Sequence, residues 1–140
     1  MGRKRFRIKF YGNYLGSVKR RGFRPSNASD IGRWGEEIVN QYLNTTYGGG
    51  HVWHNRDKES FKPYNFTNMG FNSDAKVIRP WNSTVVVSPE ELAQNRYFYG
   101  VVPKNNSNEL YDIYSMDSPG NMFDRVYDPN LDDDGAAGVF

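Results

Sequence analysis

One short stretch, Asn72-Ser73-Asp74-Ala75-Lys76-Val77-Ile78, constrains the fold of this chain most strongly. It ends in a β-branched pair, which favours a strand, and side chains alternate between the two faces of a strand. Asp74 and Lys76 are therefore expected to point one way, and Ala75 and Val77 to point into the opposite layer. A carboxylate and an ammonium placed together can hold a divalent cation beside a phosphate. The alternative is an exposed strand with an ordinary ion pair on one face.

The clearest helix of the sequence begins after Ser29 or Asp30, either of which can cap its first turn. Glu36 is expected at the inward edge of this helix, and Glu37 on the opposite flank. Gly32 and Gly35 lower helix propensity, which predicts that another backbone packs closely there. The helix region is expected to end at Gly48-Gly49-Gly50. Its apolar residues recur at helical spacing on one face, namely Ile31, Trp34, Ile38, Val39, Tyr42 and Leu43.

Shorter elements surround these two. A second helix is expected from Pro89 to about Asn95, because Ser88 can cap it, Pro89 suits its first position and Glu91 completes a capping box. That capping role explains Glu90 and Glu91, which are therefore not counted as catalytic. Alternating or β-branched runs predict strands over residues 3–11, 52–54, 63–67, 84–87, 97–102 and 110–116.

Three motifs follow one another along the chain: Ile31-Gly32-Arg33-Trp34-Gly35-Glu36-Glu37-Ile38-Val39, then Lys62-Pro63-Tyr64-Asn65-Phe66, then Asp74-Ala75-Lys76. This order of a G-x-x-G-E helix, a P-Y-(D) strand and a (D/E)-x-K strand resembles the PD-(D/E)XK nuclease superfamily. The resemblance covers about residues 29–103. It implies an α/β fold with a central mixed β-sheet flanked by helices, a restriction-endonuclease-like core. It also implies metal-dependent hydrolysis of DNA, as by an endonuclease.

The resemblance also assigns roles to residues. Asp74, the Ala75 carbonyl and Glu36 would gather Mg²⁺ or Mn²⁺, and Lys76 would orient or deprotonate a water and stabilise the transition state. Asn65 stands where the family usually has a metal-binding Asp, and a neutral amide is a weaker ligand. Three explanations stay open: another carboxylate such as Asp57 or Glu59 completes the site, the enzyme is disabled, or binding persists without cleavage.

Charge is strongly asymmetric along the chain although the net charge is only +2. We expect a basic N-terminal arm over residues 1–28, a nuclease-like core over 29–116 and an irregular acidic tail over 117–140. A basic arm attracts phosphate backbones. The alternatives are a solvated arm or one that lies on the protein's own acidic end. The residues expected to contact nucleic acid are Arg3, Lys4, Arg5, Arg7, Lys19, Arg20, Arg21 and Arg24 in the arm, and Arg33 in the helix.

The composition of the chain excludes several kinds of binding site and cofactor. The chain has no cysteine and only two histidines, so a closed structural zinc site is not expected. No glycine-rich phosphate loop is present, which argues against a nucleotide cofactor, and neither a membrane segment nor a signal peptide is recognised. A cytoplasmic location follows as an expectation, and cutting both strands of DNA would suggest a homodimer. The competing hypothesis is a catalytically inactive nucleic-acid-binding or viral structural protein, which would be associated with the virion.

Overall fold

The computed structural model describes residues 5–10, 12–20, 27–48, 52–55, 63–68, 70–78, 84–104, 109–119 and 125–127. These residues form two β-sheets and two helices, α1 (Ala28–Tyr47) and α2 (Pro89–Gln94). The protein is thus a mixed α/β protein with a mixed central sheet. Within the described ranges, neither helix has the length and apolar character needed to cross a membrane.

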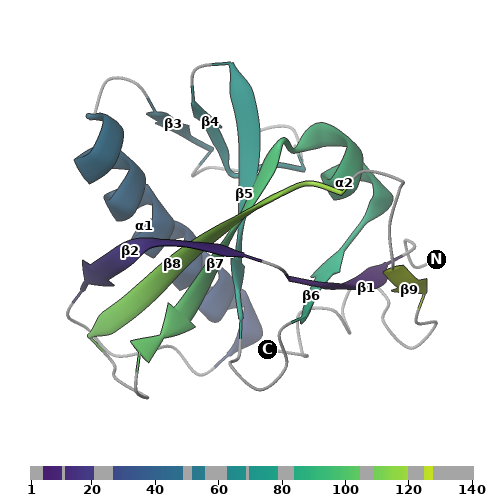
Figure 1. Ribbon diagram of the computed structural model, residues 1–140, viewed down its shortest axis with the longest axis horizontal. Helices are drawn as coiled ribbons and strands as arrows, with labels where there is room; N and C mark the ends of the chain where they lie inside the picture. The colour runs from purple at the N-terminus through teal and green to yellow at the C-terminus, as the bar shows by residue number, and fades with distance from the viewer. Residues whose placement is uncertain are drawn as a thin grey trace.

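The larger sheet has six strands in the order β2-β8-β7-β5-β4-β3. Neighbouring strands in it are antiparallel except β5 and β7, which run parallel. Figure 1 shows how β6 and α2 carry the chain from the end of β5 back to the start of β7. The strands of this sheet are β2 (Asn13–Lys19), β3 (Val52–His54), β4 (Phe66–Asn68), β5 (Phe71–Val77), β7 (Tyr97–Pro103) and β8 (Leu110–Asp117).

A smaller antiparallel sheet joins the two ends of the described chain. Its order is β6-β1-β9, formed by Thr84–Val87, Phe6–Lys9 and Arg125–Tyr127. The strand expected within residues 3–11 is confirmed as β1, and the segment expected as a basic arm supplies one strand to each sheet, β1 and β2. Arg125–Tyr127 pairs with β1, which offers a second strand edge beside β6, and this contact agrees with the alternative in which the N-terminal arm lies on the protein's own acidic end.

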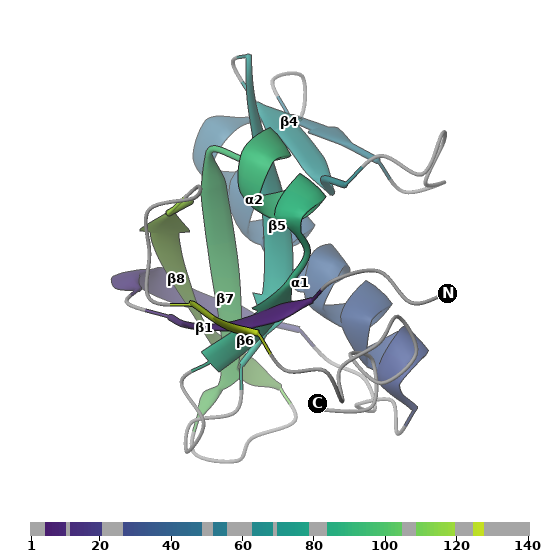
Figure 2. The ribbon, with the colours of Figure 1, turned by 90° about the vertical axis from the view of Figure 1, so that its right-hand side faces the viewer.

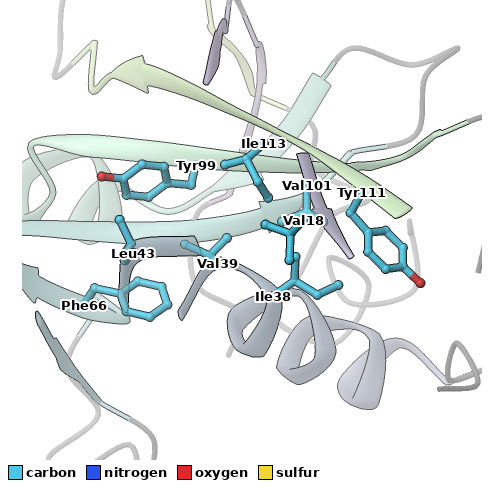
Figure 3. Close-up of a cluster of buried hydrophobic side chains, with 9 residues drawn as sticks. All are labelled: Val18, Ile38, Val39, Leu43, Phe66, Tyr99, Val101, Tyr111 and Ile113. Carbon is cyan, nitrogen blue, oxygen red and sulfur yellow. The ribbon is translucent and has the colours of Figure 1, made fainter. Parts of the chain in front are cut away.

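Helix α1 covers one face of the larger sheet with the predicted apolar stripe. Ile38, Val39 and Leu43 are fully buried and pack against Val101 and other residues of the sheet, as Figure 3 shows. The helix starts slightly earlier than expected, because Asn27 is its N-cap and its side chain accepts a hydrogen bond from the Asp30 backbone N–H at 2.8 Å. Gly48, with φ of 87°, ends the helix as predicted.

The two glycines of α1 differ in their surroundings. A Cβ at Gly35 would lie 2.5 Å from Val77 Cγ2, so α1 approaches β5 closely there, as predicted. A Cβ at Gly32 would meet nothing within 4 Å, and Gly32 is exposed. The predicted close approach is therefore wrong for Gly32, because it lies on the solvent side of the helix.

This contrast predicts opposite effects of the same substitution. Gly32→Ala should raise the free energy of unfolding by about 0.5–1 kcal/mol through helix propensity. Gly35→Ala should lower it by about 1–2 kcal/mol, because overpacking against Val77 outweighs that gain. Urea unfolding followed by tryptophan fluorescence measures both values. Equal effects at the two positions would contradict the close packing of α1 on β5.

A second core lies on the other face of the larger sheet. There Ile78 and Phe98 pack against Ile8, Val85 and Val87 of the smaller sheet and against Leu92 of α2. α2 begins as predicted, with the full capping box between Ser88 and Glu91. The larger sheet is thus enclosed by α1 on one face and by α2 with the smaller sheet on the other (Figure 2).

Tyr99 is a buried phenol in the α1 core. Burial and the neighbouring Tyr47, Tyr42 and Tyr97 raise the pKa of Tyr99 to about 12. In the unfolded chain its pKa would be about 10, so the folded state holds the proton longer and stability falls as the pH rises above 10. The wild type should lose stability more steeply than Tyr99→Phe between pH 10 and 12, by up to about 1.4 kcal/mol per pH unit. Urea unfolding across that range measures the slopes, and identical slopes would contradict the raised pKa.

Candidate active site

Strand β5 presents Asp74 and Lys76 on the face covered by α2. Ala75 and Val77 point to the opposite face and pack toward α1, as strand alternation predicts. The ammonium of Lys76 lies 3.2 Å from Asp74 Oδ2. Both side chains are largely buried, so this pair is not the exposed surface ion pair that was the alternative.

A third charged residue completes the group, which we call the charged triad: Asp74, Lys76 and Glu91. Glu91 Oε2 accepts a hydrogen bond from Lys76 Nζ at 2.8 Å, while Glu91 Oε1 accepts one from the backbone N–H of Ser88. Glu91 therefore caps α2 and also faces β5. Sequence reasoning explained Glu91 by capping alone and missed its second role. The sequence feature that could have revealed this role is the connection from β5 through β6 and α2 to the parallel strand β7, because this connection places the first turn of α2 over β5.

The charges of the triad are unequal. Burial raises the pKa of the Asp74 carboxyl well above its usual range, and Glu91 adds to this while Lys76 opposes it. Burial also acts to raise the pKa of Glu91, but Lys76 and the Ser88 N–H hold that pKa below its usual value. Two carboxyl groups thus contact one ammonium, and Glu91 is its ionised partner while burial favours the neutral form of Asp74.

Lys76 remains an ammonium in this arrangement. Burial alone would lower its pKa, but the carboxylates of Glu91 and Asp74 outweigh burial and hold the pKa above its usual value. A lysine in this state cannot accept a proton from water at neutral pH. Of the two roles expected for Lys76, this direction of its pKa favours stabilising negative charge over deprotonating water.

Asn65 lies beside the triad, at the point where β4 starts. Its Oδ1 accepts a hydrogen bond from the Ala75 backbone N–H at 2.9 Å. The oxygen that was expected to be a weak metal ligand therefore holds the edge of β5. In a strand, the N–H and C=O of one residue point to the same edge, so the Ala75 carbonyl also faces this side.

Two further asparagines surround this position. Asn55 donates its Nδ2 to the Tyr64 carbonyl at 3.3 Å, and Asn95 donates its Nδ2 to the Pro63 carbonyl at 2.8 Å. These bonds fix both amides, and each leaves a buried Oδ1 without a hydrogen-bond partner among the residues that the structure describes. Buried carbonyl oxygens of this kind normally have a partner. Asn55 follows His54, which stacks on Phe66 in the α1 core, so strand alternation places Asn55 on the face that carries Asp74.

Glu36 is buried as predicted, with 8% of its surface exposed, but its neighbour is His54 rather than the triad. His54 Nε2 lies 3.4 Å from Glu36 Oε1, and His54 Nδ1 lies 3.8 Å from Glu37 Oε2. No hydrogen bond or ion pair joins Glu36 to Asp74 or Lys76 in the described part of the chain. The structure therefore brings together Asp74, Lys76, Ala75 and Asn65, and it leaves Glu36 on the α1 side of the sheet.

The described ranges hold no set of three His, Asp or Glu side chains close enough to bind a metal ion. Asp57 and Glu59, which were expected as possible additional ligands, lie outside the described residues. The donors near β5 are nevertheless of the type that Mg²⁺ and Mn²⁺ prefer, since they are carboxylate and carbonyl oxygens.

The basic residues that the structure describes lie on different elements. Arg7 lies on β1 and its Nη1 donates to Thr84 Oγ1, whereas Lys19 is exposed at the end of β2 and Arg20 contacts Gln41 of α1. Figure 1 shows β1 and the end of β2 on opposite sides of the molecule. Arg5 precedes β1 and Arg33 is exposed on α1. Outside the described residues lie Arg3, Lys4, Arg21 and Arg24.

Comparison of the chain with protein-family models, with curated proteins and with solved structures gives no match.

Proposed function

We propose that this chain is a metal-dependent phosphodiesterase that hydrolyses DNA, with a core of the restriction-endonuclease-like type. The observation that carries this proposal is the buried charged triad, in which Lys76 contacts both Asp74 and Glu91. A buried ion pair is a poor device for stability alone, because desolvation of the charges offsets their attraction. Perturbed carboxyl and ammonium groups held together are typical of functional sites.

The order of elements supports the same proposal. A helix, three antiparallel strands, the strand β6, a second helix and a strand parallel to the D-x-K strand follow one another, which includes the strand–helix–strand order that the resemblance implies after Lys76. Strand β6 itself belongs to the smaller sheet. The first helix carries Glu36, the second strand follows Asn65 and the third carries Asp74 and Lys76.

The oxygen donors beside β5 match a divalent cation in chemical type. Asp74, the Ala75 carbonyl and Glu91 would hold it. Such an ion lowers the pKa of a bound water and neutralises charge on a phosphate. A bound divalent cation would oppose the effect of burial on the Asp74 pKa and favour its ionised form.

The residues themselves have separable roles. The Lys76 ammonium would donate hydrogen bonds to a phosphate oxygen and stabilise the charge that develops in the transition state. Glu91 would position Lys76, because it contacts the ammonium and is fixed in turn by the Ser88 N–H. Asn65 would hold β5 in place through the Ala75 N–H.

A direct experiment incubates the wild type with supercoiled plasmid and with labelled single-stranded and branched DNA in Mg²⁺ or Mn²⁺, with EDTA as the blank. We expect strand cleavage that requires the metal. A second candidate, a DNA-binding protein without cleavage, is favoured by the neutral Asn65 whose oxygen is engaged by Ala75. That candidate predicts salt-dependent binding of the same DNA without any product in either metal.

A further inference from the structure

An aromatic groove lies on the opposite face of β5 from the charged triad. Its volume is about 390 Å³, and its lining includes Tyr47, Phe71, Tyr97 and Tyr99 together with the hydroxyls of Ser73 and Ser115. Those residues come from α1 and from strands β5, β7 and β8. Ser73 and Asp74 are consecutive in β5, so the groove and the triad lie back to back across one strand.

Two of the aromatic side chains that form the walls of the groove are largely exposed to solvent. Phe71 keeps 51% of its surface exposed and Tyr47 keeps 44%. The Phe71 and Tyr97 rings meet edge to face, with their centroids 6.2 Å apart. Exposed aromatic rings held at the edge of a concave site are suited to stacking against a planar ligand.

The polar groups of the groove are neutral. Among the described residues no charged side chain lines the groove, and the groups there that can form hydrogen bonds are hydroxyls and the Asn68 amide. A phosphate or a carboxylate would find no compensating charge inside. A planar ring with N–H and C=O groups on its edge matches both the aromatic walls and the neutral polar groups.

A positive charge lies beside the groove rather than in it. The Arg96 guanidinium is 5.0 Å from the centroid of the Tyr97 ring, and half of its side chain is exposed. Its ion pair with Asp117, at 3.6 Å, is long and solvent-exposed, so it is weak. Arg96 is therefore placed to contact a backbone phosphate next to a ring held in the groove.

We infer that the aromatic groove binds an unpaired nucleobase of a single-stranded segment, with Phe71 stacking on its face and Arg96 beside its phosphate. The inference rests on the proposed function only in taking nucleic acid as the partner. According to this inference, the face of the sheet opposite the triad prefers unpaired bases. A fully paired duplex, whose bases are stacked inside, would not use this groove.

The test uses two fluorescein-labelled probes in EDTA, an oligothymidylate of 12 nucleotides and an abasic strand of the same length. Both probes carry the same phosphates, but only the first has bases. Fluorescence anisotropy measures Kd for the wild type and for Phe71→Ala. Tyr14→Ala is the matched control, because Tyr14 is an aromatic residue of similar exposure, 55%, that does not line the groove.

We expect the wild type to bind oligothymidylate more tightly than the abasic strand. Phe71→Ala should weaken binding of oligothymidylate about tenfold, as expected for the loss of one base stack, and leave the abasic strand within about twofold. Tyr14→Ala should leave both within about twofold. Equal binding of the two probes by the wild type, no binding of either, or an equal loss on both in Phe71→Ala would each overturn the inference.

The result is independent of cleavage. If the wild type cuts DNA in Mg²⁺ but Phe71→Ala binds oligothymidylate normally, the groove inference fails alone. If no cleavage occurs but the base-dependent loss is seen, the groove binds bases and the proposed hydrolysis fails.

Discussion

Replacing Lys76 with Met is expected to lower the free energy of unfolding by about 3–5 kcal/mol at pH 7. The substitution keeps most of the side-chain volume but removes the ammonium that both Asp74 and Glu91 contact. Two buried carboxylates would then repel each other without a counter-charge. Urea unfolding followed by tryptophan fluorescence measures the loss, and Lys19→Met, at an exposed position on β2, is the control, expected within about 0.5 kcal/mol of the wild type.

The pH dependence of this loss has a defined sign. Without Lys76, the pKa of both carboxyls in the folded state should lie above the unfolded values of about 4. The folded variant then binds more protons than the unfolded chain, so its stability falls as the pH rises through that window. The deficit relative to the wild type should therefore be smaller at pH 5 than at pH 7.

A rescue variant makes the electrostatic cause testable. Adding Asp74→Asn and Glu91→Gln to Lys76→Met removes all three charges, and most of the lost stability should return. A deficit below about 1 kcal/mol in Lys76→Met, or no recovery in the triple variant, would contradict a buried charged triad.

Asn65→Asp is expected to increase metal-dependent cleavage by about tenfold or more, since a single metal-site residue commonly changes activity or affinity by about 10–100-fold. A carboxylate oxygen can still accept the hydrogen bond from the Ala75 N–H, so the edge of β5 should be preserved. The new charge would add a third carboxylate near Asp74 and strengthen the attraction for a divalent cation. Initial rates of plasmid nicking at several Mg²⁺ concentrations measure the gain.

The same variant should show a linked change in stability. In EDTA, the added charge beside Asp74 should destabilise the fold, and Mg²⁺ should reverse this in proportion to its occupancy. Asn72→Asp is the matched control, because Asn72 lies on the same strand and face, two residues before Asp74. An equal gain in Asn72→Asp, or no Mg²⁺ dependence in Asn65→Asp, would count against a cation site at this edge.

Local patterns predicted most of the elements. The apolar stripe of α1, the capping box of α2 and the β-branched run at 84–87 each act through neighbouring residues, so they could be recognised without the fold. The alternation around Asp74 and Lys76 predicted their shared face for the same reason.

The sequence was less informative wherever distant segments meet. It did not indicate that Phe6–Lys9 would pair with Thr84–Val87, because strand pairing depends on contacts far apart in the chain. Contact between this segment and the acidic end was one of the alternatives, and the pairing with Arg125–Tyr127 agrees with it. Glu91 was assigned only a local capping role, although it also contacts Lys76 across the sheet. The position of Glu36 beside His54 likewise depends on how β3 lies against α1.

The most direct test of the proposed hydrolysis is the cleavage rate of Asp74→Asn compared with Asp117→Asn in the same Mg²⁺ buffer. Asp74→Asn should fold normally, because burial already favours the neutral form of Asp74 and Lys76 keeps its contact with Glu91. Asp117 is an exposed carboxylate at the end of β8 and serves as the control. The proposed function predicts that Asp74→Asn loses cleavage by about 100-fold or more while Asp117→Asn cuts like the wild type. Equal cleavage by the two variants would contradict it.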